Sequence, residues 1–223
     1  MHIAVVIPAL NEAASLPAVF ADLPPVQRVI VVDNGSTDAT ASVAEGHGAD
    51  VVAAPKRGYG TAVLAGIAHL QAAPPDVLVI LDADHADPPE ALHALVDPIA
   101  RDEADLVLSD RTASAEPGAL NFPQRFGNRL ATTLIGWSSG HKYADMGPFR
   151  AIRWTSLQQL GMEDPTWGWN VEMQLKAVQR NLRILEVPLP YRARVRGRSK
   201  ISGSLSGALR AGVRILYAFQ KYR

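Results

Sequence analysis

Short apolar runs alternate with longer mixed segments along the first half of the chain. The apolar runs are rich in β-branched residues and span residues 3–7, 28–32, 51–53, 77–81 and 105–108. Such continuous apolarity is typical of parallel strands that are buried on both faces. The segments between these runs predict helices at residues 12–21, 39–46, 60–72 and 89–101. Because strand and helix alternate, we expect an α/β fold with a mostly parallel central sheet flanked by helices.

The end of the chain has a different pattern, in which apolar residues recur at helical spacing. One stripe contains Leu205, Leu209, Val213, Leu216 and Gln220, with Ile215 and Phe219 beside it and Arg210, Arg214, Lys221 and Arg223 around the remainder. This pattern predicts a basic amphipathic C-terminal helix within residues 201–223. Such a helix can lie on an anionic membrane, or it can dock on the sheet or on a second subunit.

A chain of 223 residues suits one α/β domain, which we assign to residues 1–200. The absence of cysteine excludes disulfides and thiolate metal sites, so a metal ion would need oxygen or imidazole ligands. Charge is distributed unevenly along the chain. The residues before Met173 include 10 Lys and Arg and 21 Asp and Glu, whereas the residues after it include 12 Lys and Arg and a single acidic residue. The basic end indicates a phosphate, a nucleic acid or an anionic membrane as its neighbour.

The amino terminus enters an apolar strand directly, without the basic segment, long apolar core and cleavage site of a signal peptide. No apolar run reaches the roughly 20 residues that cross a bilayer. We therefore expect a cytoplasmic protein with neither a signal peptide nor a transmembrane helix, which could still lie on the surface of a membrane.

Polar clusters follow four of the predicted strands, and ligands of open parallel sheets bind beyond the carboxyl ends of the strands. The cluster after the fourth strand contains Asp82 and Asp84, separated by one small residue. Alternate residues of an extended strand share a face, so both carboxylates can converge on Mg²⁺ or Mn²⁺ that holds a diphosphate. Alternatively, they are solvated residues that cap the next helix.

The clusters at residues 8–12 and 33–38 also have two interpretations. They could contact an anionic ligand, a ribose or a base at the amino termini of the following helices. Ser36, Thr37 and Asp38 suit capping of the next helix equally well. Residues 112–120 are predicted to form an exposed loop and are a candidate lid.

Taken in order, these segments resemble the motifs of glycosyltransferase family 2. The resemblance rests on residues 8–12, 32–38, 58–62 and 82–84, and it continues through residues 145–151, 169–172, 186–188 and 194–200. The later segments are most similar to those of dolichyl-phosphate and polyprenyl-phosphate sugar synthases. The resemblance implies a single GT-A, Rossmann-like domain, with a nucleotide-sugar half at about residues 1–110 and an acceptor half at about residues 111–200.

The resemblance also implies roles for individual residues. The nucleotide-sugar pocket would contain Pro8, Ala9, Asn11, Glu12, Asp33, Asn34, Arg57, Gly58, Gly60, Asp82 and Ala83. Asp82 and Asp84 would hold the metal ion and the diphosphate. The acceptor phosphate would contact Arg111, Arg125, Arg129, Arg194, Ser199 and Lys200, although the arginines could also be solvated surface residues.

The candidate catalytic residues are Asp84, Asp145 and Glu172. If the acceptor is a hydroxyl group, Glu172 is the first candidate for the base and Asp145 the second. Both could instead be structural partners of cations. A phosphate acceptor is already anionic and needs no strong base.

One departure from the family pattern concerns the residues after the acidic pair. The synthases commonly continue with Leu-Gln-His-Pro-Pro, whereas this chain has His85, Ala86, Asp87 and two prolines. Ala86 cannot bind a metal ion, so an additional water, Asp87 or His85 would have to replace the glutamine ligand.

The implied reaction is an inverting, metal-dependent transfer of a hexose from a UDP- or GDP-sugar to a polyprenyl or dolichyl phosphate at a membrane surface. The same donor chemistry with a soluble acceptor is the main alternative. A nucleotidyltransferase would need a loop rich in Gly and Arg after the first strand, and a noncatalytic nucleotide-sugar-binding module remains a further alternative. No nucleic acid partner is expected, because RNA-binding aromatics on the strands are missing. A homo-oligomer or a membrane-protein partner is left open.

Overall fold

The computed structural model describes residues 1–193 and 205–223, with the backbone alone for residues 205–211. Arg194, Ser199 and Lys200, predicted above to contact the acceptor phosphate, lie outside the described residues. Within them, one seven-stranded sheet has the order β3-β2-β1-β4-β6-β5-β7. Its strands are β1 (Ile3–Ala9), β2 (Arg28–Asp33), β3 (Asp50–Ala53), β4 (Val77–Ile80), β5 (Leu106–Asp110), β6 (Arg150–Arg153) and β7 (Ile184–Pro188). Only β6 runs antiparallel to its neighbours, which confirms a mostly parallel sheet.

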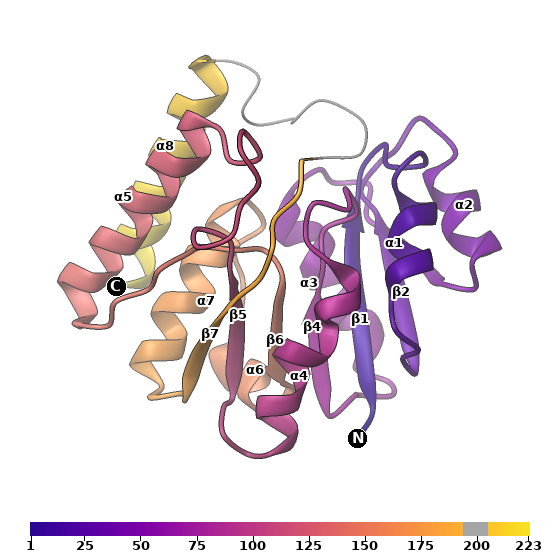
Figure 1. The fold of residues 1–223 in the computed structure, drawn as a ribbon, viewed down its shortest axis with the longest axis horizontal. Coiled ribbons are helices and arrows are strands. Elements are labelled where there is room, and N and C mark those ends of the chain that lie inside the picture. The colour runs from indigo at the N-terminus through magenta and orange to yellow at the C-terminus, as the bar shows by residue number, and fades with distance from the viewer. Residues whose placement is uncertain (194–204) are drawn as a thin grey trace.

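Helices cover both faces of this sheet (Figure 1). One face packs against α1 (Leu16–Asp22), α2 (Thr40–Gly46) and α4 (Leu92–Ala100), which a short 3-10 turn, η1 (Pro89–Ala91), precedes. The other face packs against α3 (Tyr59–Leu70), α6 (Trp154–Leu160) and α7 (Gly168–Gln179), with α5 (Phe122–Ser139) and α8 (Leu205–Tyr222) beside α7.

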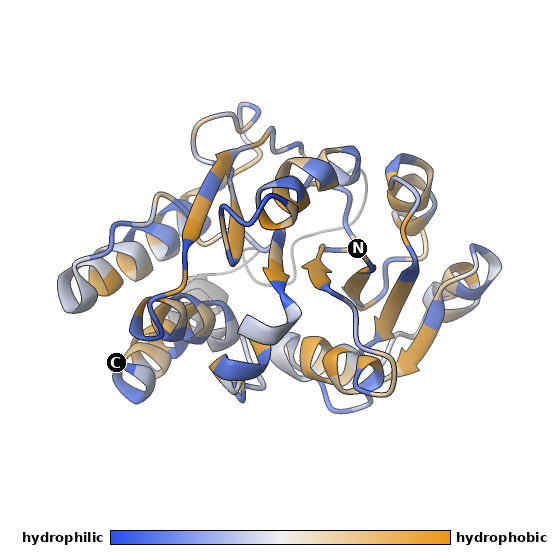
Figure 2. Cartoon of the chain, turned by 90° about the horizontal axis from the view of Figure 1, so that it is seen from below, coloured by the Kyte–Doolittle hydropathy of each residue, from blue (hydrophilic) through white to orange (hydrophobic). Residues whose placement is uncertain are grey.

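Successive side chains of each strand point to opposite faces of the sheet, which explains the two apolar layers. In β1, Val6 points into one layer and Val5 into the other, and in β4 the same holds for Ile80 and Val79. All four side chains are fully buried, so each strand is apolar on both faces, as the continuous apolar runs predict. Figure 2 shows the apolar strands between the two layers of helices.

The elements missed by sequence reasoning lie in the second half of the chain. β6 begins and ends with arginine, so it lacks the apolar pattern of the other strands. α5 starts with a capping box, in which Asn121 Oδ1 accepts the backbone N–H of Gln124 at 3.0 Å and Gln124 Oε1 accepts that of Asn121 at 2.9 Å. It ends at Gly140, whose φ of 74° is in the left-handed region that favours glycine. Such local signals carry little information about where the helix packs.

Two local expectations about the first helices need correction. The helix predicted from residue 12 begins only at Leu16. Of the cluster expected to cap α2, only Asp38 bonds to its first turn, where Asp38 Oδ1 accepts the Thr40 N–H at 3.0 Å. The Ser36 hydroxyl instead accepts the Asn11 N–H at 2.9 Å, and the Thr37 N–H donates to Asn11 Oδ1 at 2.7 Å. These side chains connect the loops after β1 and β2 instead.

The predicted C-terminal helix is present as α8, and it docks with one face only. Val213 and Leu216 of the predicted apolar stripe are exposed, so this part of the stripe does not dock on the described part of the chain. The buried side chains are Ala218, Phe219 and Tyr222, because α8 packs against α5 and α7 along the neighbouring face. An amphipathic pattern thus identified the helix but not the face that docks. Within the described residues, the structure contains no helix that is both long and apolar enough to cross a bilayer.

Candidate functional site

The loops after β1, β2 and β3 meet at the carboxyl edge of the sheet, where Ala9 and Asp33 are paired across neighbouring strands. Asn34 is buried there and connects three segments. Its amide nitrogen donates to Ala54 O at 2.7 Å and to Lys56 O at 2.9 Å, and its amide oxygen accepts the N–H of Gly58 at 2.8 Å. Asn34 therefore shapes the loop that contains Arg57 and Gly58, whereas the Arg57 side chain is exposed.

The predicted nucleoside-pocket residues Asn11 and Glu12 follow Pro8 and Ala9 at the same edge. Asn11 has a φ of 54°, an uncommon left-handed conformation, and the Glu12 N–H donates to Thr40 Oγ1 at 2.9 Å. Asp33 Oδ1 accepts the Ser36 N–H at 2.9 Å. The structure thus brings these predicted residues together and holds them in place with hydrogen bonds between loops.

Gly58 and Gly60 contact the segment before α7. A Cβ atom at Gly60 would lie 1.9 Å from Asp164 O, and one at Gly58 would lie 2.2 Å from Pro165 O. The N–H of Gly60 donates to Thr166 O at 3.1 Å. Both glycines are therefore required by close packing of two backbone segments, a reason that the sequence could not reveal.

Glu172, on α7, holds that same segment. Its carboxylate is fully buried and accepts the N–H of Glu163 at 2.9 Å, the N–H of Asp164 at 2.8 Å and Lys176 Nζ at 2.6 Å. These contacts involve both carboxylate oxygens. The role of Glu172 as a base stays a prediction, and the contacts themselves describe a structural anchor.

Asp82 and Asp84 follow β4, which pairs with β1 in the centre of the sheet. Asp82 is half-buried, Ala83 and Asp84 are buried, and Asp84 Oδ1 accepts the N–H of Ala86 at 3.0 Å. His85 follows with a φ of 60° and places its Nε2 2.8 Å from Asp22 Oδ2. The hydrogen bond to Ala86 thus holds the Asp84 carboxylate, and the contact with Asp22 holds the turn that follows it.

In the described part of the chain, no group of three or more His, Cys, Asp or Glu side chains is arranged to hold a metal ion. Two carboxylates at one strand end nevertheless fit Mg²⁺ or Mn²⁺, because Mg²⁺ is usually bound by one or two carboxylates together with phosphate oxygens and waters. The residues thus fit a metal ion that binds together with a diphosphate.

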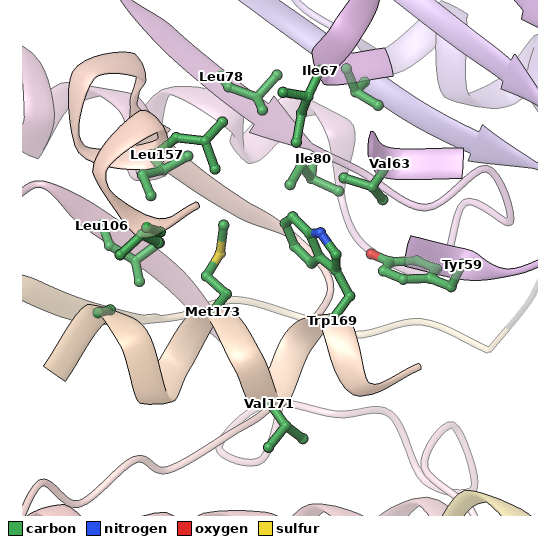
Figure 3. Close-up of a cluster of buried hydrophobic side chains, with 14 of the residues drawn as sticks. Tyr59, Val63, Ile67, Leu78, Ile80, Leu106, Leu157, Trp169, Val171 and Met173 are labelled. Atoms are coloured by element: carbon green, nitrogen blue, oxygen red, sulfur yellow. The ribbon is translucent and has the colours of Figure 1, made fainter. Parts of the chain in front are cut away.

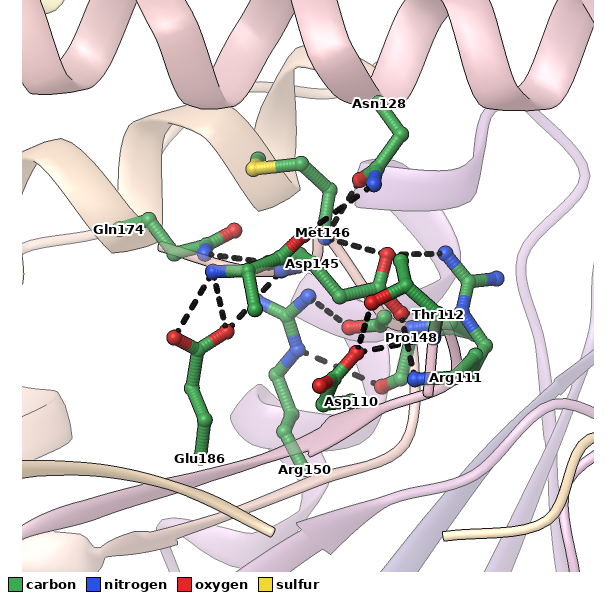
Figure 4. A network of polar contacts seen from close by, with 12 residues as sticks. Asp110, Arg111, Thr112, Asn128, Asp145, Met146, Pro148, Arg150, Gln174 and Glu186 are labelled. Carbon is green, nitrogen blue, oxygen red and sulfur yellow. Dashed lines mark hydrogen bonds and ion pairs between the residues drawn. The ribbon is translucent and has the colours of Figure 1, made fainter. Parts of the chain in front are cut away.

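The predicted acceptor residue Arg111 forms a buried ion pair with the predicted catalytic residue Asp145 (Figure 4). Arg111 Nε lies 2.7 Å from Asp145 Oδ2, and Arg111 Nη2 lies 3.0 Å from Asp145 Oδ1. Burial alone would raise the pKa of Asp145, but the charge and hydrogen bonds of Arg111 outweigh it and hold the pKa below its ordinary value. Asp145 is therefore an ionised partner of Arg111.

Side chains that sequence reasoning did not assign hold the segment around Asp145. Glu186 accepts the N–H of Asp145 at 3.0 Å, Gln174 donates to its carbonyl at 3.1 Å, and Asn128 accepts the N–H of Met146 at 2.7 Å. Arg150 is fully buried below them and donates to Pro148 O at 3.3 Å. These four residues come from four different elements. Arg150 and Glu186 lie in segments that resemble family motifs, but their contacts with the segment around Asp145 could not be predicted from those motifs.

Arg125 and Arg129 lie on α5, and both side chains are exposed. Neither is part of the buried pair of Arg111 with Asp145. Of the predicted phosphate-binding arginines that the structure describes, one is therefore a buried ion-pair partner and two are exposed cations on a helix beside the site.

Comparisons with known proteins define the class. The sequence profile of glycosyl transferase family 2 matches residues 4–161. An uncharacterised glycosyltransferase of Mycobacterium tuberculosis is 38% identical over 211 residues, which cover 93% of this chain and 93% of that protein. A dolichyl-phosphate hexose transferase of Haloferax volcanii is 33% identical over 218 residues, which cover 92% of this chain and 89% of that protein.

A solved structure agrees in its fold. Glucosyl-3-phosphoglycerate synthase of Mycobacterium tuberculosis, in complex with Mn²⁺, UDP-glucose and phosphoglyceric acid, matches with a TM-score of 0.79. The match has 25% identity and covers 98% of this chain and 80% of that one. The α/β fold and its relatives thus define an enzyme of the glycosyltransferase class. The chain belongs to glycosyltransferase family 2, as the ordered motifs predicted.

Proposed function

We propose that this glycosyltransferase transfers a hexose from a UDP- or GDP-sugar to a polyprenyl phosphate, with inversion and with the help of Mg²⁺ or Mn²⁺. The observation that carries the proposal is the pair Asp82 and Asp84 at the end of a central strand, beside the loops that Asn34 holds together. Similarity to a dolichyl-phosphate hexose transferase over 92% of the chain supports the acceptor class. Glucosyl-3-phosphoglycerate synthase, crystallised with Mn²⁺ and UDP-glucose, supports the donor class and the metal ion.

In this mechanism, Asp82 and Asp84 would hold the metal ion, which neutralises charge on the departing nucleoside diphosphate. Asn11, Glu12 and Asp33 would line the nucleoside pocket, and the loop at Gly58 would form its rim. A phosphate acceptor brings its own nucleophilic anion and needs no base. The contacts of Glu172 and Asp145 with Lys176 and Arg111 then suit positioning roles, in which Asp145 orients Arg111.

The surface formed by α5 and α8 supports a lipid acceptor. Large apolar side chains are exposed on both helices, including Phe122 at 79% and Trp137 at 76% exposure, and also Phe126, Leu216 and Tyr217. The sequence of α5 contains Arg125 and Arg129, that of α8 contains two arginines and Lys221, and neither helix contains aspartate or glutamate. Exposed aromatics among cations suit the boundary of an anionic bilayer, and Arg125 and Arg129 would then meet the phosphate of the acceptor.

The second candidate keeps the donor and uses a soluble acceptor. It is supported by the same solved structure, because that enzyme binds phosphoglyceric acid on a fold that matches 98% of this chain. The two candidates differ in whether turnover depends on lipid.

Calorimetric titration with UDP-glucose and GDP-mannose, with and without Mn²⁺, tests the donor site. We expect metal-dependent binding of one donor by the native chain and none by Asp84→Ala. Asp97→Asn is a suitable control, because Asp97 is an exposed residue of α4. Absence of binding of either donor under every metal condition would refute the proposal. Transfer to undecaprenyl phosphate in vesicles, compared with transfer to 3-phosphoglycerate, then separates the two acceptors.

A further inference from the structure

Asp87 is a buried carboxyl group without a partner. It follows the acidic pair in the loop after β4 and is 1% exposed. Among the residues that the structure describes, neither of its carboxylate oxygens has a hydrogen-bond partner. Buried polar groups are almost always satisfied in native proteins, because an unsatisfied one loses its hydration without compensation. A ligand that supplies a donor would remove this cost.

The hydroxyl of Tyr59 is a second buried polar group without a hydrogen-bond partner in the described residues. Tyr59 begins α3, is 8% exposed, and its hydroxyl has no partner within the described residues. Figure 3 shows the hydroxyl directed toward the indole of Trp169, whose ring centroid lies 6.4 Å from that of Tyr59. Burial, together with the charges of Asp82 and Asp87, raises the pKa of this hydroxyl.

The charges around Asp87 decide which ligand group can bind there. Burial raises the pKa of Asp87 well above its ordinary value; Arg111 lowers it, and Asp82, Asp84 and Asp145 raise it further. Arg111 directs two donors to Asp145 rather than to Asp87. An anionic group of the ligand that is not held by a metal ion would be repelled by Asp82, Asp84 and Asp145. A neutral hydroxyl group, by contrast, can donate a hydrogen bond to Asp87.

We propose that Asp87 is a specificity-determining residue that accepts a hydrogen bond from a hydroxyl group of the donor hexose. The inference rests on the proposed function, because it assumes a nucleotide-sugar at Asp82 and Asp84. A role of Asp87 as a third metal ligand is disfavoured, since no three such side chains are arranged for a metal ion in the described residues. Asp87 stands where the family pattern has histidine, so the chain would recognise its sugar differently from the synthases.

The test compares Asp87→Ala and Asp87→Asn with the native chain and with the exposed control Asp97→Asn. Each protein is titrated with whichever of UDP-glucose and GDP-mannose the native chain binds, with its deoxy analogues that each lack one sugar hydroxyl, and with the corresponding nucleoside diphosphate. We expect Asp87→Ala to weaken binding of the nucleotide-sugar roughly 10-fold to 100-fold and to leave that of the nucleoside diphosphate unchanged. One deoxy analogue should bind the native chain as weakly as the complete donor binds Asp87→Ala.

Thermal unfolding without ligand provides a readout that a structural role would not produce. We expect both variants to be at least as stable as the native chain, because they remove an unsatisfied buried carboxyl group. The inference would be overturned if the variants lost stability. It would also be overturned if Asp87→Ala weakened binding of the nucleoside diphosphate as much as binding of the nucleotide-sugar. If both variants bind the donor as tightly as the native chain does, this inference is wrong but the proposed function stands. If the native chain binds neither donor, the proposed function fails as well.

Discussion

Replacement of Asp145 by asparagine removes one charge from the buried pair with Arg111 and keeps the size of the side chain. Asp145 is 1% exposed and the Arg111 side chain is 12% exposed, so water cannot replace the lost partner. Asp145 also accepts the N–H of Arg111 at 3.0 Å and that of Met146 at 2.7 Å. Breaking a buried pair in this way leaves an uncompensated charge and costs about 3–5 kcal/mol of unfolding free energy.

Urea denaturation followed by circular dichroism measures this loss for Asp145→Asn at neutral pH. Glu103→Gln is the matched control, because Glu103 contacts Arg101 at 2.9 and 3.0 Å with the same two-point geometry. That pair is exposed, with side-chain exposures of 57% for Arg101 and 54% for Glu103. The control should leave the unfolding free energy within experimental error. Equal effects of the two substitutions would refute the reasoning that burial decides the value of the pair.

The pH dependence follows from the direction of the pKa shift. The pKa of Asp145 is lower in the folded chain than in the unfolded chain, so its ionised form stabilises the fold. This contribution is complete above the unfolded pKa of about 3.9 and is lost as the pH falls through the folded pKa. The difference in stability between the native chain and Asp145→Asn should therefore shrink below about pH 4, and a constant difference would contradict the assignment.

Three further predictions concern the loops of the site. Gly60→Ala should lower the melting temperature by several degrees, at a cost of about 1–3 kcal/mol, because the added Cβ would lie 1.9 Å from Asp164 O. Gly46→Ala is the control and should leave the melting temperature unchanged, because no atom lies within 4 Å of its added Cβ. Asn34→Ala should cost about 1–3 kcal/mol in urea denaturation and weaken donor binding, because it removes three hydrogen bonds between loops. Glu172→Gln should lower the melting temperature and retain most transferase activity if Glu172 anchors the segment at Asp164. Loss of activity at unchanged stability would instead identify Glu172 as the base.

Much of the first half of the fold could be predicted from sequence. The five apolar runs became β1 to β5, because strands buried on both faces need continuous apolarity and few other segments of this chain have it. The same reasoning missed β6, which begins and ends with arginine, and β7, in which Glu186 interrupts a short apolar run. Arg150 in β6 shows the reason: its charge suggests a surface residue, whereas the structure buries it against the carbonyl of Pro148 and the ring of Trp169.

The candidate site was predictable where residues are close in sequence. Asp82 and Asp84 lie two residues apart, and their common position at a strand end follows from the strand itself. The pairing of Arg111 with Asp145 joins residues 34 apart, and Asp145 also depends on Glu186, 41 residues away. Sequence spacing carries no information about such contacts.

The sequence by itself determined the α/β class, the parallel arrangement of the first strands and the polar edge at their carboxyl ends, because these follow from local alternation of apolar and polar residues. Only the tertiary structure decided which face of α8 docks and which arginine is buried. It also decided that Gly60 contacts the backbone before α7 and that Asp87 is left without a partner among the described residues. These outcomes depend on how distant segments exclude water from one another, and that is a property of the packed chain rather than of any segment.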